Sequence, residues 1–74
     1  MDKIYKNNIK KYLEEAKANG KTITNIIKDA QVGVGTFYEI MRGNQVPRLD
    51  TAVKISRALN ATTFEIFPIL KEEM

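Results

Sequence analysis

The stretch TITNIIKDAQVGVGTFYEIMRG, residues 22–43, sets the strongest limit on how this chain can fold. Apolar residues recur at helical spacing on both sides of a short break. They are Ile26, Ala30 and Val32 on the first side and Phe37 and Ile40 on the second. The break, Gln31-Val32-Gly33, is short enough that Val32 must turn inward to fill the space between the helices. The pattern predicts two short helices, one ending near Ala30 and the next running from about Val34 to Arg42.

Threonine and glycine mark the expected ends of these helices. Thr22 is a candidate N-cap, because its hydroxyl can accept a hydrogen bond from a free backbone N–H of the first turn. Thr24 is a second possibility, so this boundary stays open. The later helix is expected to stop at Gly43, since glycine adopts the left-handed C-terminal conformation without penalty.

An earlier helix is predicted over residues 3–18. Its apolar residues follow the 3.6-residue period and form one core-facing stripe: Tyr5, Ile9, Tyr12, Leu13 and Ala16. Four lysines line up beside that stripe: Lys3, Lys6, Lys10 and Lys17. These lysines are either a solvated flank or a row of contacts to phosphate groups. Asn19-Gly20 is expected to end the helix.

Two more helices are predicted after a loop at residues 44–47, which ends in a proline that disfavours helical geometry before it. The expected buried residues of the first are Leu49, Ala52, Val53, Ile55 and Leu59. Asn60 is a plausible left-handed cap, and Thr62 and Glu65 have the spacing of a capping box. A short fifth helix from Thr63 to about Phe67 follows, and Pro68 either ends it or begins a tail over residues 68–74. The sequence thus predicts a compact all-α domain of five helices over residues 1–74.

Composition excludes several classes of protein. The chain has 74 residues, no cysteine and no histidine, so disulfides and thiolate or imidazole metal sites are not expected. Its apolar runs are too short to span a bilayer and nothing resembles a signal peptide, which favours a cytoplasmic protein. An enzyme is not expected, because no serine lies beside a general base and the acidic pairs are adjacent rather than facing. No cofactor or small-molecule ligand is evident.

The positive charge is concentrated in the N-terminal half. The formal net charge is +3, and residues 1–21 hold six lysines against three acids. Residues 22–48 hold three cations against two acids, whereas residues 49–74 carry one net negative charge. This distribution fits a polyanionic partner, and it fits simple solubility equally well.

The second half of the chain contains an ordered set of motifs, P-R-L-D-T-A-V-K-I-S-R-A-L-N-A-T-T-F-E-I-F. The positions that carry the pattern are Pro47, Leu49, Asp50, Thr51, Lys54, Ile55, Ala58, Leu59, Thr62, Glu65, Ile66 and Phe67. Upstream, the matching positions are Thr22, Ile26, Ala30, Val32, Thr36, Phe37, Ile40 and Gly43. Over residues 22–67, without a gap, the chain resembles the Cro and phage-repressor (XRE-type) helix-turn-helix regulators.

The resemblance implies a lambda-repressor-like fold, with the helix-turn-helix at about residues 22–43 and the helix 34–42 in the DNA major groove. Thr36 would then hold a phosphate, and Asn44 and Gln45 would meet the DNA backbone. Arg42 either complements the helix dipole or touches phosphate. The residues implied to face base edges are Val34, Gly35, Tyr38 and Glu39. The full set implied to bind DNA is Thr22, Gly33, Val34, Gly35, Thr36, Tyr38, Glu39, Arg42, Asn44 and Gln45.

The chain departs from the family pattern in the parts that would read DNA. Ile23 replaces the usual glutamine, Gln31 replaces the usual glycine of the turn, and Ile27 replaces an alanine. The bulk of Ile27 is expected to push the two helices apart or to change their angle. The base-reading stretch is Gly33-Val34-Gly35-Thr36, so it lacks the Arg and Gln side chains whose bidentate pairs each supply about 1–3 kcal/mol of discrimination. Specificity would then rest on DNA shape, on the loop or on dimer spacing.

The expected function is a sequence-specific transcriptional regulator, a repressor that binds double-stranded DNA as a homodimer on an inverted repeat. Two-fold symmetry would place the half-sites about 34 Å apart. The dimer surface is expected to use apolar residues near the C-terminus: Phe64, Phe67, Ile69 and Leu70. The alternative is a protein-interaction module on the same scaffold, such as an antitoxin or anti-repressor, with weak or no base readout.

Overall fold

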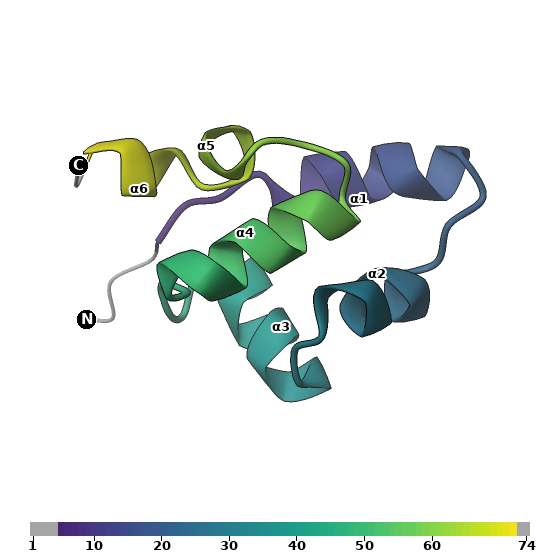
Figure 1. Ribbon diagram of the computed structural model, residues 1–74, viewed down its shortest axis with the longest axis horizontal. Coiled ribbons are helices and arrows are strands. Elements are labelled where there is room, and N and C mark those ends of the chain that lie inside the picture. Colours follow the sequence, from purple (N-terminus) through teal and green to yellow (C-terminus); the bar gives the residue numbers. More distant parts are fainter. Residues whose placement is uncertain (1–4, 73–74) are drawn as a thin grey trace.

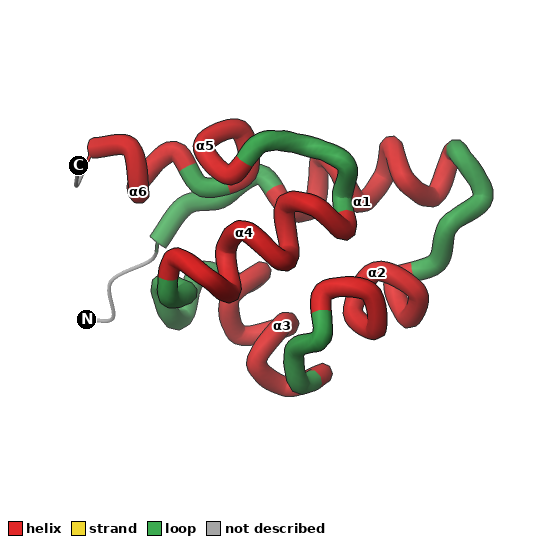
Figure 2. Tube along the Cα trace, in the orientation of Figure 1, coloured by secondary structure: helices red, strands yellow, loops and turns green. Residues whose placement is uncertain are grey.

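The computed structural model describes residues 5–72, and all regular structure among them is helical. The helices are α1 (Ile9–Ala18), α2 (Ile23–Ala30), α3 (Val34–Arg42), α4 (Leu49–Ala58), α5 (Thr63–Ile66) and α6 (Pro68–Glu72). In Figure 1, α4 lies in the middle of the view, with α2 and α3 below it and α1 and α5 above. Short loops join consecutive helices (Figure 2). The all-α prediction is confirmed for the described residues, whereas the prediction of five helices is wrong because α6 is a sixth.

The boundaries of α2 and α3 lie where local sequence chemistry places them. The Thr22 hydroxyl accepts a hydrogen bond from the Asn25 backbone N–H at 3.1 Å, so Thr22 is the N-cap and Thr24 lies inside the helix. The Asn25 side chain accepts from the Thr22 backbone in return, which completes a capping box. At the other end of this stretch, Gly43 follows α3 in the left-handed conformation with φ 85°.

The first helix begins at Ile9, so the prediction that it starts at Lys3 is wrong. Residues 5–8 instead run as an extended arm past α5 (Figure 1). In this arm the backbone N–H of Tyr5 donates to Gly43 O at 2.9 Å, and that of Asn8 donates to Ile66 O at 2.8 Å. The backbone N–H groups of Tyr5 and Asn8 thus find their acceptors in distant parts of the chain, so residues 5–8 need no helical hydrogen bonds of their own.

The row of lysines predicted on the first helix does not form. Lys6 lies in the extended arm, and only Lys10 and Lys17 of the four lie on α1. Lys3 lies outside the described residues.

The second half follows the predicted signals, with exceptions at Leu49, Val53 and Pro68. Asn60 has φ 59°, as expected of a left-handed cap, and Thr62 and Glu65 form the predicted capping box. Leu49 was expected to be buried, but it is 55% exposed because it lies in the first turn of α4, on the side away from the core. Val53 was expected to be buried, but it is half-buried and lies outside the core cluster. The chain then re-enters a helix at Pro68, since a proline at the first helical position gives up only a donor that would be free anyway.

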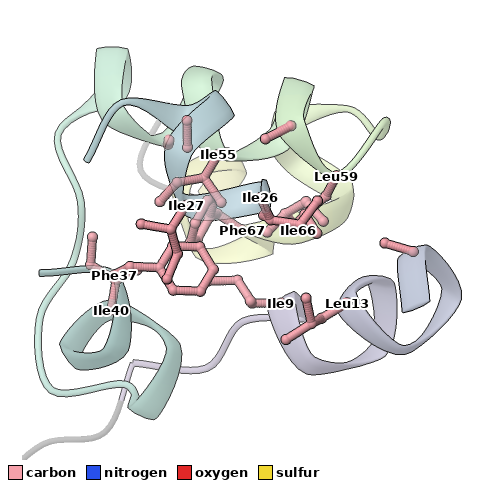
Figure 3. Packing of buried hydrophobic residues seen from close by; sticks show 14 residues of the cluster. Ile9, Leu13, Ile26, Ile27, Phe37, Ile40, Ile55, Leu59, Ile66 and Phe67 are labelled. Carbon is pink, nitrogen blue, oxygen red and sulfur yellow. The ribbon is translucent and has the colours of Figure 1, made fainter. Parts of the chain in front are cut away.

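A single cluster of buried side chains joins the helices (Figure 3). Its members are Ile9, Leu13, Ala16, Ile26, Ile27, Ala30, Phe37, Ile40, Ala52, Ile55, Ala58, Leu59, Ile66 and Phe67. The helix α4 packs against α2 and α5. The radius of gyration is 11.5 Å, close to the value of about 11 Å that a compact chain of this length should have. The one buried polar residue of the described chain, Ser56, donates its hydroxyl to Ala52 O at 2.8 Å.

Candidate nucleic-acid interface

The link between α2 and α3 turns the chain within three residues. Gln31 adopts the left-handed conformation with φ 57° and ψ 39°, which is a conformation that glycine would reach at lower cost. Val32 is half-buried and packs against the core, as predicted. Ile27, which we expected to separate the helices, lies in the core cluster together with Phe37 (Figure 3). The side chains of Phe37 and Ile40 therefore fix α3 to the core and leave its opposite face to solvent.

The start of α3 is exposed, and no side chain caps it. Gly33 is its N-cap and forms no side-chain hydrogen bond, so the first backbone N–H groups of the helix point outward without a local acceptor. Val34 is 60% exposed, and a Cβ built on Gly35 would meet nothing within 4 Å. The Thr36 hydroxyl lies in the same turn and is exposed. This end of the helix combines N–H donors, a hydroxyl and one apolar side chain, which suits an anionic oxygen beside an apolar group.

The outward face of α3 continues through Glu39 and Arg42, which lie four and seven positions after Gly35 and so share its side of the helix. Tyr38, which the resemblance implied to face base edges as Val34 and Gly35 do, is less exposed than they are. Its ring is half-buried, packs against the core and meets Phe37 edge to face, with 6.2 Å between the ring centroids.

Four of the predicted DNA-binding residues form one connected group at the end of α3. The Arg42 guanidinium lies 3.5 Å from Glu39 Oε2 and 5.9 Å from the centroid of the Tyr38 ring. The side-chain amide of Asn44 donates to the same Glu39 oxygen at 2.9 Å. Glu39 is thus not an isolated acid, because a cation and an amide donor compensate its charge and are oriented by it.

Thr22 and Gln45 lie outside this group. The Thr22 hydroxyl is used within its own capping box, since it accepts from Asn25 N and donates to Asn25 Oδ1 at 2.8 Å. Gln45 is exposed in the loop after α3. The sequence left the cap open between Thr22 and Thr24, and it did not indicate Asn25 as the partner, because the usual capping-box pattern has Glu or Gln at that position.

Sequence reasoning also missed a hollow between the arm and the end of α3. It has a volume of about 340 Å³ and is lined by Tyr5, Lys6, Asn7, Asn8, Lys10, Met41 and Arg42. Three of these side chains are cations, and none of the lining residues within 5–72 is acidic, although Glu39 lies 3.5 Å from Arg42. The signal that could have indicated this arrangement was Asn7-Asn8, a pair typical of a helix N-terminus, just before Ile9.

The predicted dimer residues are only partly available. Phe64 is 40% exposed, and Ile69 and Leu70 are half-buried. Phe67 is 1% exposed, so its assignment to a dimer interface is wrong: its ring fills the core of the single chain.

Two classes of site find no support in the described residues. No helix within residues 5–72 is long and apolar enough to cross a membrane. The same residues contain no group of three His, Cys, Asp or Glu side chains able to hold a metal ion.

Comparisons with protein-family models, with curated proteins and with solved structures find no significant match to this chain.

Proposed function

We propose that the chain is a lambda-repressor-like helix-turn-helix domain that binds double-stranded DNA with α3 and acts as a transcriptional repressor. The observation that carries this proposal is the start of α3. It has an uncapped, exposed end at Val34, Gly35 and Thr36, while Phe37 and Ile40 anchor the same helix in the core. A short helix held rigidly by one face and bare on the other has the geometry for entering a major groove.

Phosphate contacts would come from two places on this surface. The free N–H groups of α3 and the Thr36 hydroxyl would hold one phosphate at the helix start. The cations around the hollow beside the arm, Lys6, Lys10 and Arg42, would hold the DNA backbone that flanks the groove. Those three cations predict a slope of about −3 per monomer for the logarithm of affinity against the logarithm of salt concentration.

Base contacts would be few. Val34 offers an apolar contact to a thymine methyl, and Gly35 allows the backbone to approach a base edge closely. Neither contact distinguishes bases as strongly as a bidentate Arg or Gln would. We therefore place most of the specificity in DNA shape and in the spacing of two half-sites.

The homodimer would form through C-terminal apolar residues, namely the exposed Phe64 with the accessible parts of Ile69 and Leu70. Phe67 is excluded because it is buried. This patch is small, so the dimer is expected to be weak without DNA and to be completed on an inverted repeat with half-sites about 34 Å apart.

Selection of bound duplexes from a random pool, followed by salt titration of the best sequence, tests the proposal. A symmetric consensus with two half-sites, bound with a salt slope near that of two monomers, is the expected result. Failure to retain any duplex at low salt would overturn it.

The second candidate is a protein-interaction module, and Val34 is the observation that favours it. A valine 60% exposed at the start of α3, followed by a glycine, suits an apolar protein groove as well as a thymine methyl. Two results together would favour the protein-interaction module over the DNA-binding domain. The wild type would retain no duplex, and a protein partner that binds through α3 would lose affinity for the Val34→Asp variant.

A further inference from the structure

The outward face of α4 carries two apolar side chains that the core does not use. Leu49 is 55% exposed, Val53 is half-buried, and neither belongs to the core cluster or to the side chains packed against it. They lie four positions apart on one helix, so they form a continuous apolar strip about one turn long. This strip faces solvent on a different helix from the proposed DNA-binding surface.

Charged side chains surround this apolar strip. A shallow hollow over α4 is lined by Arg48, Leu49, Asp50, Val53, Lys54 and Arg57, which sets three cations against one acid. Arg48 Nε lies 4.0 Å from Asp50 Oδ1, so Asp50 forms an ion pair with one of the three cations. Among the described residues, Lys54 and Arg57 form no ion pair, which leaves two positive charges beside the apolar strip without a partner.

We infer that this α4 surface binds an acidic amphipathic segment of another protein. The cations complement Asp or Glu side chains, and the strip of Leu49 and Val53 complements one or two large apolar side chains at helical spacing. That combination is typical of a partner helix that lies in a groove and contacts it with side chains at positions i and i+4. The cationic rim would steer the acidic partner to the surface, and the apolar contact would supply most of the affinity.

Two other occupants fit less well. The DNA backbone would satisfy Lys54 and Arg57 but would leave Leu49 without an apolar partner. A second copy of the chain placed face to face by two-fold symmetry would bring the same cations against each other, which is unfavourable. An acidic partner avoids both conflicts.

The test is selection of peptides from a display library of random sequences against the intact chain. The expected peptides are rich in Asp and Glu and carry two large apolar residues three or four positions apart. Leu49→Ser should weaken their binding at least fivefold, since apolar anchors at interfaces typically contribute more than about 1 kcal/mol. The double variant Lys54→Glu/Arg57→Glu should weaken it at least tenfold, because it reverses the field of the rim.

Matched controls separate this surface from the rest of the molecule. Val34→Ser removes another exposed apolar side chain, and Lys28→Glu reverses another exposed cation; neither lies in the α4 hollow, so neither should change peptide binding. All variants are folded if their circular dichroism and urea unfolding match the wild type.

Recovery of no peptides, or of neutral or basic ones, would overturn the inference. Selected peptides whose affinity does not change in Leu49→Ser would also overturn it. The same holds if duplex DNA competes with the peptides for Lys54 and Arg57 while Leu49→Ser has no effect on either ligand. A failure of the chain to bind DNA would leave the inference standing.

Discussion

The side-chain amide of Asn7 donates a 2.8 Å hydrogen bond to the backbone carbonyl of Ile40, 33 positions along the chain. Two neighbouring bonds support it: Asn7 Oδ1 accepts from Ile9 N at 3.0 Å, and Tyr5 N donates to Gly43 O at 2.9 Å. The arm before α1 thus caps the last turn of α3 and the first turn of α1 at once. The position of α3, and with it the proposed DNA surface, depends on a segment that precedes the helix-turn-helix.

Replacing Asn7 should destabilise the fold. Asn7→Ala removes the donor to Ile40 and the acceptor for Ile9, so the expected loss in the free energy of unfolding is about 1–2 kcal/mol. Urea unfolding followed by circular dichroism measures it. Lys6→Ala, in the same arm but exposed, serves as the control and should change stability by no more than about 0.5 kcal/mol. Equal stability of the two variants would show that the arm does not hold α3.

The contact between Tyr12 and Glu65 predicts a pH dependence of stability. Tyr12 donates its hydroxyl hydrogen to Glu65 Oε2 at 2.9 Å, while Glu65 Oε1 accepts from the Thr62 hydroxyl at 2.8 Å. Hydrogen bonds from Thr62 and then Tyr12 lower the pKa of Glu65 below its ordinary 4.5. The bond to Glu65, followed by the partial burial of the ring, raises the pKa of Tyr12 above 10.0.

The signs of these two shifts differ. Because the folded pKa of Glu65 is depressed, its contribution to stability is present above pH 4.5 and is lost as the pH falls through the folded pKa. The folded pKa of Tyr12 is raised, so its contribution is present below pH 10.0 and is lost as the pH rises through the folded pKa. Glu65→Gln should therefore flatten the acid limb of the stability profile and also weaken the alkaline limb, because it removes the carboxylate that raises the pKa of Tyr12. Tyr12→Phe should flatten the alkaline limb and reduce the acid limb only in part, because the bonds from Thr62 still lower the pKa of Glu65. Urea midpoints measured across pH would contradict this if each variant kept both limbs of the wild type.

The left-handed turn residue Gln31 should be improved by glycine. At φ 57° a glutamine side chain is strained, and glycine relieves that strain at the cost of more entropy in the unfolded chain. We expect Gln31→Gly to stabilise the fold by about 0.5–1 kcal/mol. Asn60→Gly is the matched control at φ 59°, and it should gain less because asparagine tolerates this conformation better than glutamine does. A loss of stability in Gln31→Gly would contradict the geometry of the turn.

The two phenylalanines near the C-terminus should respond to truncation in opposite ways. Phe67→Ala removes a ring that is 1% exposed and should cost about 3–5 kcal/mol, which is enough to unfold a domain of this size. Phe64→Ser removes a ring that is 40% exposed; it should leave the monomer folded and weaken self-association. Sedimentation equilibrium together with thermal unfolding checks both. An unfolded Phe64→Ser variant would remove the basis for the proposed dimer surface.

Features set by a few adjacent residues could be predicted from the sequence, whereas features set by distant contacts could not. Thr22, Gly43 and Asn60 form the caps that their residue types indicate, because capping depends on groups within about four positions. The start of α1 could not be placed, since helical periodicity favoured residues 3–18 while hydrogen bonds to Gly43 and Ile66 hold residues 5–8 outside the helix.

The burial of individual apolar side chains also could not be predicted from the local sequence pattern. Leu49 and Phe67 are both apolar, yet one is exposed and the other buried, because burial depends on which elements pack over each position. In the candidate site, Glu39 and Arg42 lie three positions apart on α3, so helical spacing alone allows their ion pair. The hydrogen bond from Asn44 to Glu39 could not be predicted, because it depends on the course of the chain after Gly43.

Gly35 offers the most direct measurement of the central claim, that the exposed start of α3 faces DNA. A Cβ at this position meets nothing within 4 Å, so Gly35→Glu should fold as well as the wild type or be more stable by about 0.5–1 kcal/mol. Its carboxylate would lie against phosphates and base edges, and the affinity for the selected duplex should fall at least tenfold. Ala18→Glu, which makes the same charge change at the end of α1, should lower it far less. A Gly35→Glu variant that bound the duplex as tightly as the wild type would show that α3 does not face DNA.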